Sequence, residues 1–159
     1  MISDEQFTRE TMELSPALYR LSMSILRHEA DCRDAVQQAL VNAWAVRGRV
    51  DPARFRAYLT RIVVNECRNI QRQRQRVSPV AELPETGAAW QPEETELGAA
   101  IGLLPENLRT PLLLFYMENY TEKETARALG ISVTALKNRL FRARRALKQR
   151  LTDWEVAPK

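Results

Sequence analysis

The chain has 159 residues, of which 45% are hydrophobic and 28% are charged, a composition typical of a soluble globular protein and not of a disordered one. That length allows one domain or two small ones. The longest apolar run, Leu112–Met117, is far shorter than the ~20 residues of a membrane span, and the polar N-terminus predicts no signal peptide. Two cysteines and one histidine cannot supply the ligands of a usual zinc site. We therefore expect a cytosolic protein with reduced thiols, no metal and no cofactor.

The charges are unevenly distributed, although the net charge is only +4. The net charge is −3 over residues 1–46, +7 over 47–76 and −6 over 77–106, and residues 132–159 carry +6. Basic segments attract the phosphates of nucleic acids. Two basic segments separated by an acidic one therefore predict two nucleic-acid contacts.

The first fifty residues predict three helices. Residues 4–13 form a short first helix, and Ser15-Pro16 is an N-cap and first-turn pair that begins a second. Asp31 opens the third helix and Gly48 closes it. The exposed face of the third helix is mixed, with Arg33, Gln37, Gln38 and Val41. Such a face suits a protein partner, but the pattern alone favours an ordinary solvated surface.

A long basic helix is predicted from Asp51-Pro52, again an N-cap pair, to Arg76. Its buried face consists of Phe55, Leu59, Ile62, Val63 and Ile70. The opposite face is a stripe about 100° wide with Arg54, Tyr58, Arg61, Asn65, Arg68, Asn69, Arg72 and Arg76. Arginine neutralises phosphates, an aromatic ring stacks on an unpaired base, and asparagine reads a base edge. Because the stripe contains no acid, we interpret it as a nucleic-acid contact rather than a solvated face.

The helical periodicity of apolar residues ends after this helix. Residues 77–96 contain three prolines and no basic residue, and we interpret them as an interdomain linker. A further apolar helix covers about Glu106–Asn119 and should pack against the segment that follows. Pro111 should either kink that helix or mark its true start, with Thr110 as the cap.

Residues 120–150 predict two helices joined by a tight turn. Thr121 and Glu124 can form a capping box, Gly130 can end the first helix in the left-handed conformation, and Ser132 can cap the second. The buried stripe of the second helix is Val133, Leu136, Leu140, Ala143, Leu147 and Leu151. Its opposite face carries Thr134, Asn138, Phe141, Arg142 and Arg145, with Lys137 and Lys148 at the edge. This arrangement favours a DNA-reading helix-turn-helix over a plain helical hairpin.

Three runs of residues carry a family resemblance. Residues 31–44 fit the pattern D-x-x-D-x-V-Q-E-x-F/L-x-x-x-W except at Gln38, and residues 55–65 fit F-x-x-W-L-x-x-I-x-x-N with Tyr58 in place of Trp. The third run extends from Leu104 through the Gly130 turn into the basic helix. In this order they resemble the extracytoplasmic-function sigma factors of bacterial RNA polymerase. The resemblance implies an all-α fold with two helical domains, residues 1–76 and 97–154, joined by the linker.

The resemblance also implies a promoter-specificity subunit that is not an enzyme, with three groups of site residues. The clamp of core polymerase would contact Asp31, Asp34, Gln37 and Gln38. The −10 element would contact Arg47, Arg49, Arg54, Tyr58, Arg61, Asn65, Arg68, Asn69 and Arg72. In the −35 element, base edges would lie nearest Thr134, Lys137, Asn138, Phe141 and Arg142, and phosphates would bind Arg139, Arg144, Arg145 and Lys148.

The partners that the resemblance implies are core RNA polymerase, promoter DNA and an anti-sigma factor, often membrane-anchored, with a monomer as the free state. One alternative is a dimeric helix-turn-helix repressor of duplex DNA, which leaves the stripe from Arg54 to Arg76 without a role. Another is an enzyme that acts on nucleic acid, but the sequence lacks a carboxylate cluster or His/Cys constellation suited to that chemistry.

Overall fold

A computed structural model describes residues 2–77 and 96–154, and every regular element in these ranges is helical, as the sequence predicts. The α-helices are α1 (Asp4–Leu26), α2 (Glu29–Ala45), α3 (Phe55–Val77), α4 (Glu96–Gly102), α5 (Glu106–Leu112), α6 (Glu122–Leu129) and α7 (Val133–Trp154). None of the helices in the described ranges has the length and apolarity to cross a membrane. The predicted linker, residues 77–96, lies almost wholly outside the described residues.

Helix α1 is a single helix, so the prediction of two helices that meet at Ser15-Pro16 is wrong. Ser15 is not an N-cap; its hydroxyl donates back to the Thr11 carbonyl at 2.8 Å. Pro16 has no N–H to donate to the Met12 carbonyl, but Pro16 and Met12 both lie on the exposed face, where solvent can reach that carbonyl. Burial of the opposite face therefore keeps the helix continuous.

The start and the end of α2 both differ from the prediction. The helix begins at Glu29 and not at Asp31, because His28 is the N-cap and its Nδ1 accepts from the Asp31 amide at 3.4 Å. Gly48 does not close the helix, which ends at Ala45 and is followed by a 3₁₀ turn, Arg47–Arg49. Asp51 is a cap, as predicted, but it caps a 3₁₀ turn, Pro52–Arg54, and α3 itself begins at Phe55.

Pro111 does not mark the start of a helix, which was one of the two predicted forms, and the other form, a kink, stays a prediction. Pro111 lies inside α5, and the chain then widens into a π-helix, Leu113–Met117. Thr110 is therefore not a cap, and its buried hydroxyl has no hydrogen-bond partner in the part of the chain that the structure describes. Leu112, the last residue of α5, belongs to a hydrophobic cluster within the C-terminal half, whereas Leu113 and Leu114, the first residues of the π-helix, belong to the cluster that spans both halves.

The helix-turn-helix forms as predicted. Thr121 and Glu124 make both bonds of the capping box, at 3.0 and 2.9 Å. Gly130 has φ +71° at the end of α6, and the Ser132 hydroxyl accepts from the Ala135 amide at 3.0 Å to cap α7. The predicted stripe of α7 is buried at Leu136, Leu140, Ala143 and Leu147.

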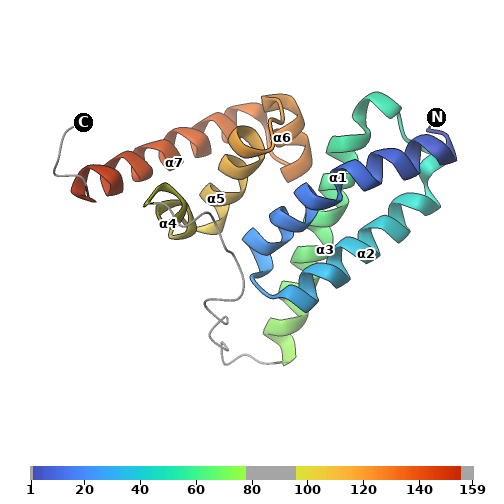
Figure 1. Cartoon of the computed structure of the whole chain (residues 1–159), viewed down its shortest axis with the longest axis horizontal. Coiled ribbons are helices and arrows are strands. Elements are labelled where there is room, and N and C mark those ends of the chain that lie inside the picture. Colours follow the sequence, from blue (N-terminus) through green and yellow to red (C-terminus); the bar gives the residue numbers. More distant parts are fainter. Residues whose placement is uncertain (1, 78–95, 155–159) are drawn as a thin grey trace.

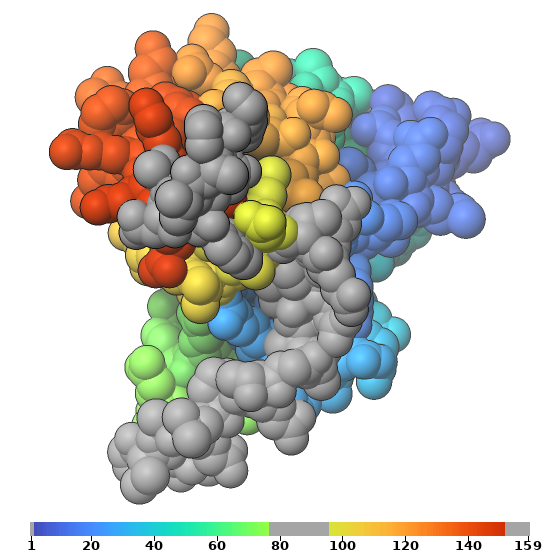
Figure 2. Space-filling view, turned by 60° about the vertical axis from the view of Figure 1, so that its left-hand side comes forward, coloured from blue at the N-terminus to red at the C-terminus, as the bar shows by residue number. Residues whose placement is uncertain are grey.

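One hydrophobic cluster spans the two halves of the chain, and a second lies within the C-terminal half. Figure 1 shows α1, α2 and α3 side by side on one side of the molecule, with α4 to α7 on the other and α6 next to α3. One continuous cluster joins Leu59, Val63 and Cys67 of α3 to Leu114 and Leu129 of the C-terminal half. In the space-filling view of Figure 2 the blue surface of α1 meets the orange surface of the helix-turn-helix. The predicted domains are thus in direct contact.

Both cysteines are buried and free, as expected of small apolar side chains. Burial raises the pKa of the Cys32 thiol to about 11 and that of Cys67 to about 12. In the described ranges, no three His, Cys, Asp or Glu side chains cluster in a way that could hold a metal ion.

Candidate nucleic-acid interface

Helix α7 exposes the side chains that the sequence predicts for duplex DNA. Those exposed are Thr134, Lys137, Asn138, Phe141, Arg142, Arg144, Arg145 and Lys148. Phe141 has 55% of its surface exposed, which is unusual for a large apolar side chain. Arg144 donates to the Tyr116 hydroxyl at 2.7 Å, and this bond holds its guanidinium at the edge of the face. The eight residues form one polar, basic surface with an aromatic residue in its middle.

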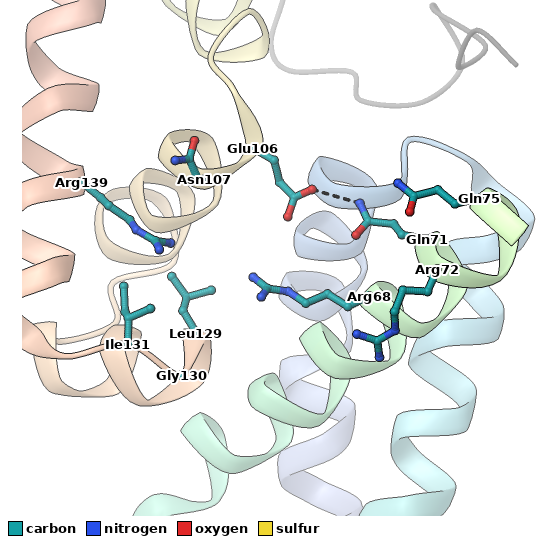
Figure 3. Close-up of a pocket in the computed structure, with 10 residues that line it drawn as sticks. All are labelled: Arg68, Gln71, Arg72, Gln75, Glu106, Asn107, Leu129, Gly130, Ile131 and Arg139. Carbon is teal, nitrogen blue, oxygen red and sulfur yellow. Dashed lines mark hydrogen bonds between the residues drawn. The ribbon is translucent and has the colours of Figure 1, made fainter. Parts of the chain in front are cut away.

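Helix α3 carries the predicted stripe, but the structure divides it into two parts. Arg54, Asn65, Asn69, Arg72 and Arg76 are exposed, whereas Tyr58, Arg61 and Arg68 are half-buried. Arg68 points toward the helix-turn-helix, and Arg139 of α7 points back at it (Figure 3). Arg139 is thus the one predicted α7 contact that is half-buried rather than exposed.

Arg61 is covered by the turn of the helix-turn-helix. Its guanidinium donates to the Arg127 carbonyl at 3.4 Å, at the C-terminal end of α6, where the helix dipole favours a cation. A Cβ atom at Gly130 would lie only 1.9 Å from Nη1 of Arg61. Gly130 therefore serves two purposes: it adopts a positive φ and it leaves room for Arg61.

The predicted loop contacts, Arg47 and Arg49, differ in their surroundings. Arg47 lies 3.4 Å above the Trp44 ring, donates to the Trp44 carbonyl at 2.7 Å, and pairs with Asp4 at 2.8 Å. Arg49 is exposed. The structure thus fixes one arginine of this loop and leaves the other at the surface.

The predicted polymerase contacts lie along one side of α2. Asp34, Gln37 and Gln38 are exposed, and the Gln38 amide donates to Asn42 at 3.0 Å. Asp31 is different, because its carboxylate accepts from Arg74 of α3 at 2.5 and 2.6 Å and only 14% of its side chain is exposed. A cleft of about 650 Å³ runs here between α2 and α3, with Asp31, Asp34 and Gln38 in its lining.

A cluster that the sequence analysis missed joins α3 to α6. Arg56 donates through Nη2 and Nε to both carboxylate oxygens of Glu124, at 2.5 and 3.0 Å, and its guanidinium lies 4.2 Å above the Tyr120 ring. Burial raises the pKa of Glu124, but hydrogen bonds from Arg56 and Thr121 outweigh it, so that pKa lies below its ordinary value. Because the Thr60 hydroxyl already donates to the Arg56 carbonyl, the Tyr120 hydroxyl is the donor in their 2.8 Å bond.

A second missed contact joins α5 to α1. Arg109 is only 5% exposed, and its guanidinium donates twice to the Ser24 carbonyl in the last turn of α1 and once to the Leu104 carbonyl at 2.6 Å. It thereby caps a helix that has no basic residue in its own last turn. Burial lowers the pKa of Arg109 to about 10, which leaves it charged at neutral pH. Arg20 and Glu118 add a bidentate pair near this contact, at 2.7 and 2.8 Å.

Family models match both halves of the chain. The model for Sigma-70 region 2 matches residues 12–77, and the model for Sigma-70, region 4 matches residues 94–147. The ECF RNA polymerase sigma factor SigM of Mycobacterium tuberculosis is 32% identical over 155 residues, which cover 93% of this chain and 76% of the relative. This chain belongs to the extracytoplasmic-function sigma factors.

Other sigma factors support this assignment. The RNA polymerase sigma factor CnrH of Cupriavidus metallidurans is 31% identical over 150 residues, which cover 82% of this chain and 78% of CnrH. A solved structure of CnrH with the cytosolic domain of CnrY matches 96% of this chain and 91% of that one, with a TM-score of 0.68. The sigma factor RpoE of Bartonella quintana, solved with the anti-sigma factor NepR, shares the fold with a TM-score of 0.76 at 23% identity, over 92% and 96% of the two chains.

In this sigma factor, region 2 corresponds to most of α1 together with α2 and α3, and region 4 to most of α4 to α7. The residues that join the two regions, Arg56, Arg109, Tyr120 and Glu124, fall within these matches. None of them stands out in the sequence: Arg109 lies in a leucine-rich stretch from Leu103 to Met117, but Glu106, Asn107 and Thr110 share that stretch, so nothing marks the arginine as buried.

Proposed function

We propose that this sigma factor directs core RNA polymerase to a two-part promoter, with α7 on the −35 duplex and the α3 stripe on the unpaired −10 strand. The observation that carries the proposal is the presence of two faces rich in cations, one on each region, with no acid among the predicted contact residues. Glu122 of α6 lies at the border of the α7 face, 4.0 Å from Lys137. We expect the protein to contribute binding energy to promoter melting and no catalytic activity of its own.

On the −35 element, the exposed face of α7 would lie in the major groove. Asn138 can make a bidentate contact to adenine, Arg142 to guanine, and Phe141 an apolar contact to a thymine methyl group. Thr134 and Lys137 flank these positions. Arg139, Arg144, Arg145 and Lys148 would bind phosphates, which supply affinity without sequence information.

On the −10 element, Tyr58 would stack on an exposed base, and the asparagines and arginines of the stripe would hold the strand. The other −10 residues in this proposal are Arg47, Arg49, Arg54, Arg61, Asn65, Arg68, Asn69 and Arg72. Arg61 and Arg68 are half-covered by region 4 in the present arrangement. The two elements lie about 25 base pairs apart, or about 85 Å of duplex at ~3.4 Å per pair. We therefore propose that regions 2 and 4 separate when the protein binds core polymerase and DNA.

The clamp of core polymerase would bind the polar side of α2 through Asp31, Asp34, Gln37 and Gln38. Arg74 neutralises Asp31 in this arrangement, so the pair would have to exchange partners if Asp31 binds the clamp. We also propose regulation by an anti-sigma factor, because two similar sigma factors have been solved with such proteins or their cytosolic domains. A membrane-anchored regulator of this kind would hold the protein at the cytosolic face of the membrane.

Run-off transcription with core polymerase and a library of upstream regions tests the proposal. We expect transcripts only when the sigma factor is added, and a shared two-part motif upstream of their start sites. A helix-turn-helix repressor would instead give no new transcripts and would bind its operator without polymerase, and either result would exclude the proposal.

A further inference from the structure

The cleft between α3 and the helix-turn-helix has the features of a binding site. It encloses about 470 Å³, within the usual range of small-ligand pockets, and both regions of the sigma factor line it. Arg68 and Arg72 come from α3, Glu106 and Asn107 from α5, and Arg139 from α7 (Figure 3). The site exists only while the two regions are in contact.

The charge of this cleft favours an anion. Figure 3 shows the guanidinium groups of Arg68 and Arg139 pointing toward each other from opposite walls. Two like charges that face each other across a cleft are unfavourable unless an anion lies between them. Among the described residues that line the cleft, Glu106 is the only acid, and its carboxylate accepts from the amide of Gln71 at 3.0 Å.

Arg68 is half-buried at this cleft. Its Nε atom is buried and has no hydrogen-bond partner among the described residues. A ligand in the cleft would therefore meet the guanidinium group through its two terminal nitrogens. Arg68 and Arg139 both present planar forks of donors, and a phosphate or a carboxylate group binds such a fork in a bidentate manner.

We propose that this cleft binds a small polyphosphate, with at least two phosphate groups, between Arg68 and Arg139. Three arginines against one occupied glutamate call for a ligand with more than one negative charge, and the volume admits a diphosphate with or without a nucleoside. Arg72 at the rim, whose guanidinium donates to Asn69, adds to the positive potential. The amides of Gln71 and Asn107 supply further polar groups around the ligand.

Occupancy would also hold the sigma factor in its closed arrangement. A ligand that binds only when regions 2 and 4 touch stabilises that contact by mass action. The same ligand would occupy Arg68, which belongs to the proposed −10 surface, and Arg139, which belongs to the proposed −35 surface. The ligand would therefore compete with promoter DNA for these two arginines. This competition rests on the proposed function, whereas the anion site itself does not.

Isothermal titration of the full chain alone, at constant ionic strength, tests the site without polymerase or DNA. Inorganic pyrophosphate and ADP are the probes, since they distinguish an inorganic ligand from a nucleotide. We expect saturable binding of at least one probe at one site per chain, and a loss of tenfold or more in Arg139→Gln. Arg145→Gln removes an exposed cation from the same helix outside the cleft and should change the affinity less than twofold.

Gly130→Ala provides a second variant that alters no charge. It displaces Arg61 from the turn and should loosen the contact between the regions, so we expect it to weaken the binding of the probe severalfold. Equal losses in Arg139→Gln and Arg145→Gln, or no saturable binding of either probe, would overturn the proposal. The proposal would also be overturned if Arg139→Gln weakened the binding of a single-stranded oligonucleotide but not that of either probe, because the cleft would then be a nucleic-acid contact.

Discussion

Replacement of Glu124 by Gln separates the contact between the two regions from the helix cap. The Glu124 carboxylate accepts two bonds from Arg56 and one from the Thr121 amide. Glutamine can still complete a capping box, because its side-chain oxygen can accept from the N-cap amide. The substitution therefore removes the charge that pairs with Arg56 and leaves the start of α6 intact.

The structure sets the size of the effect. A hydrogen bond to a charged group contributes about 1.5–3 kcal/mol when it is well buried, whereas an exposed ion pair contributes about 0–1 kcal/mol. The side chains of Arg56 and Glu124 are 35% and 26% exposed, so this pair lies between the two limits. Solvent screening and one retained bond to the glutamine oxygen reduce the loss further. We expect Glu124→Gln to lower the free energy of unfolding by about 1 kcal/mol.

A double-mutant cycle in urea unfolding measures this interaction directly. The cycle combines Glu124→Gln with Arg56→Gln, and we expect a coupling energy of about 1 kcal/mol. The matched control is the exposed Arg33–Glu29 pair within α2, each side chain 62% exposed, for which about 0.3–0.5 kcal/mol is typical. A coupling energy for Arg56–Glu124 no larger than that of the control would refute the view that this pair holds the two regions together.

Three further predictions use other properties. Because the pKa of Glu124 in the folded protein lies below its ordinary value of 4.5, the ionised carboxylate stabilises the fold above pH 4.5, and this stability is lost as the pH falls through the pKa of the folded protein. Between pH 5 and 3, the melting temperature should therefore fall more steeply in the wild type than in Glu124→Gln. Parallel melting curves of the two proteins against pH would contradict this. Asn138→Ala should change promoter preference. Arg145→Ala should weaken binding to all promoters and reduce the slope of log affinity against log salt concentration by roughly 0.9. Equal losses of affinity on every promoter for both variants would refute the assigned roles. Iodoacetamide at pH 8 should not alkylate Cys32 or Cys67 in the folded protein, because burial raises the pKa of the two thiols to about 11 and about 12. We expect complete alkylation only in urea. Rapid labelling of the folded protein would contradict the burial of these thiols.

Local signals explain which parts of the fold could be predicted. The capping box of Thr121 and Glu124, the glycine at position 130 and the Asp51 cap each act within four residues, so the sequence alone indicates them. Ser15-Pro16 carries an equally good local signal, and it misleads. Tertiary packing of α1 outweighs it, because the proline faces solvent and the buried face continues from Phe7 to Leu21 without a break.

The candidate site likewise has a part that local sequence predicts and a part that depends on tertiary packing. Helical periodicity places the exposed residues of α7 and α3 correctly, since it depends on the element alone. It cannot show that α3 has a second buried side, formed by Thr60, Val64 and Cys67, against region 4. Nor can it pair Arg56 with Glu124, which are 68 positions apart. Those contacts arise from the packing of two regions, and no periodic pattern within either one records them.

Footprinting of a promoter found by run-off transcription tests the central claim most directly. With core polymerase and the sigma factor together, we predict protection at both the −35 and −10 elements and permanganate-reactive thymines at −10. With the sigma factor alone at the same concentration, we predict no protection and no reactive thymines at −10, because region 4 half-covers Arg61 and Arg68. Strong protection of a single duplex site by the protein alone, unchanged by core polymerase, would contradict the account.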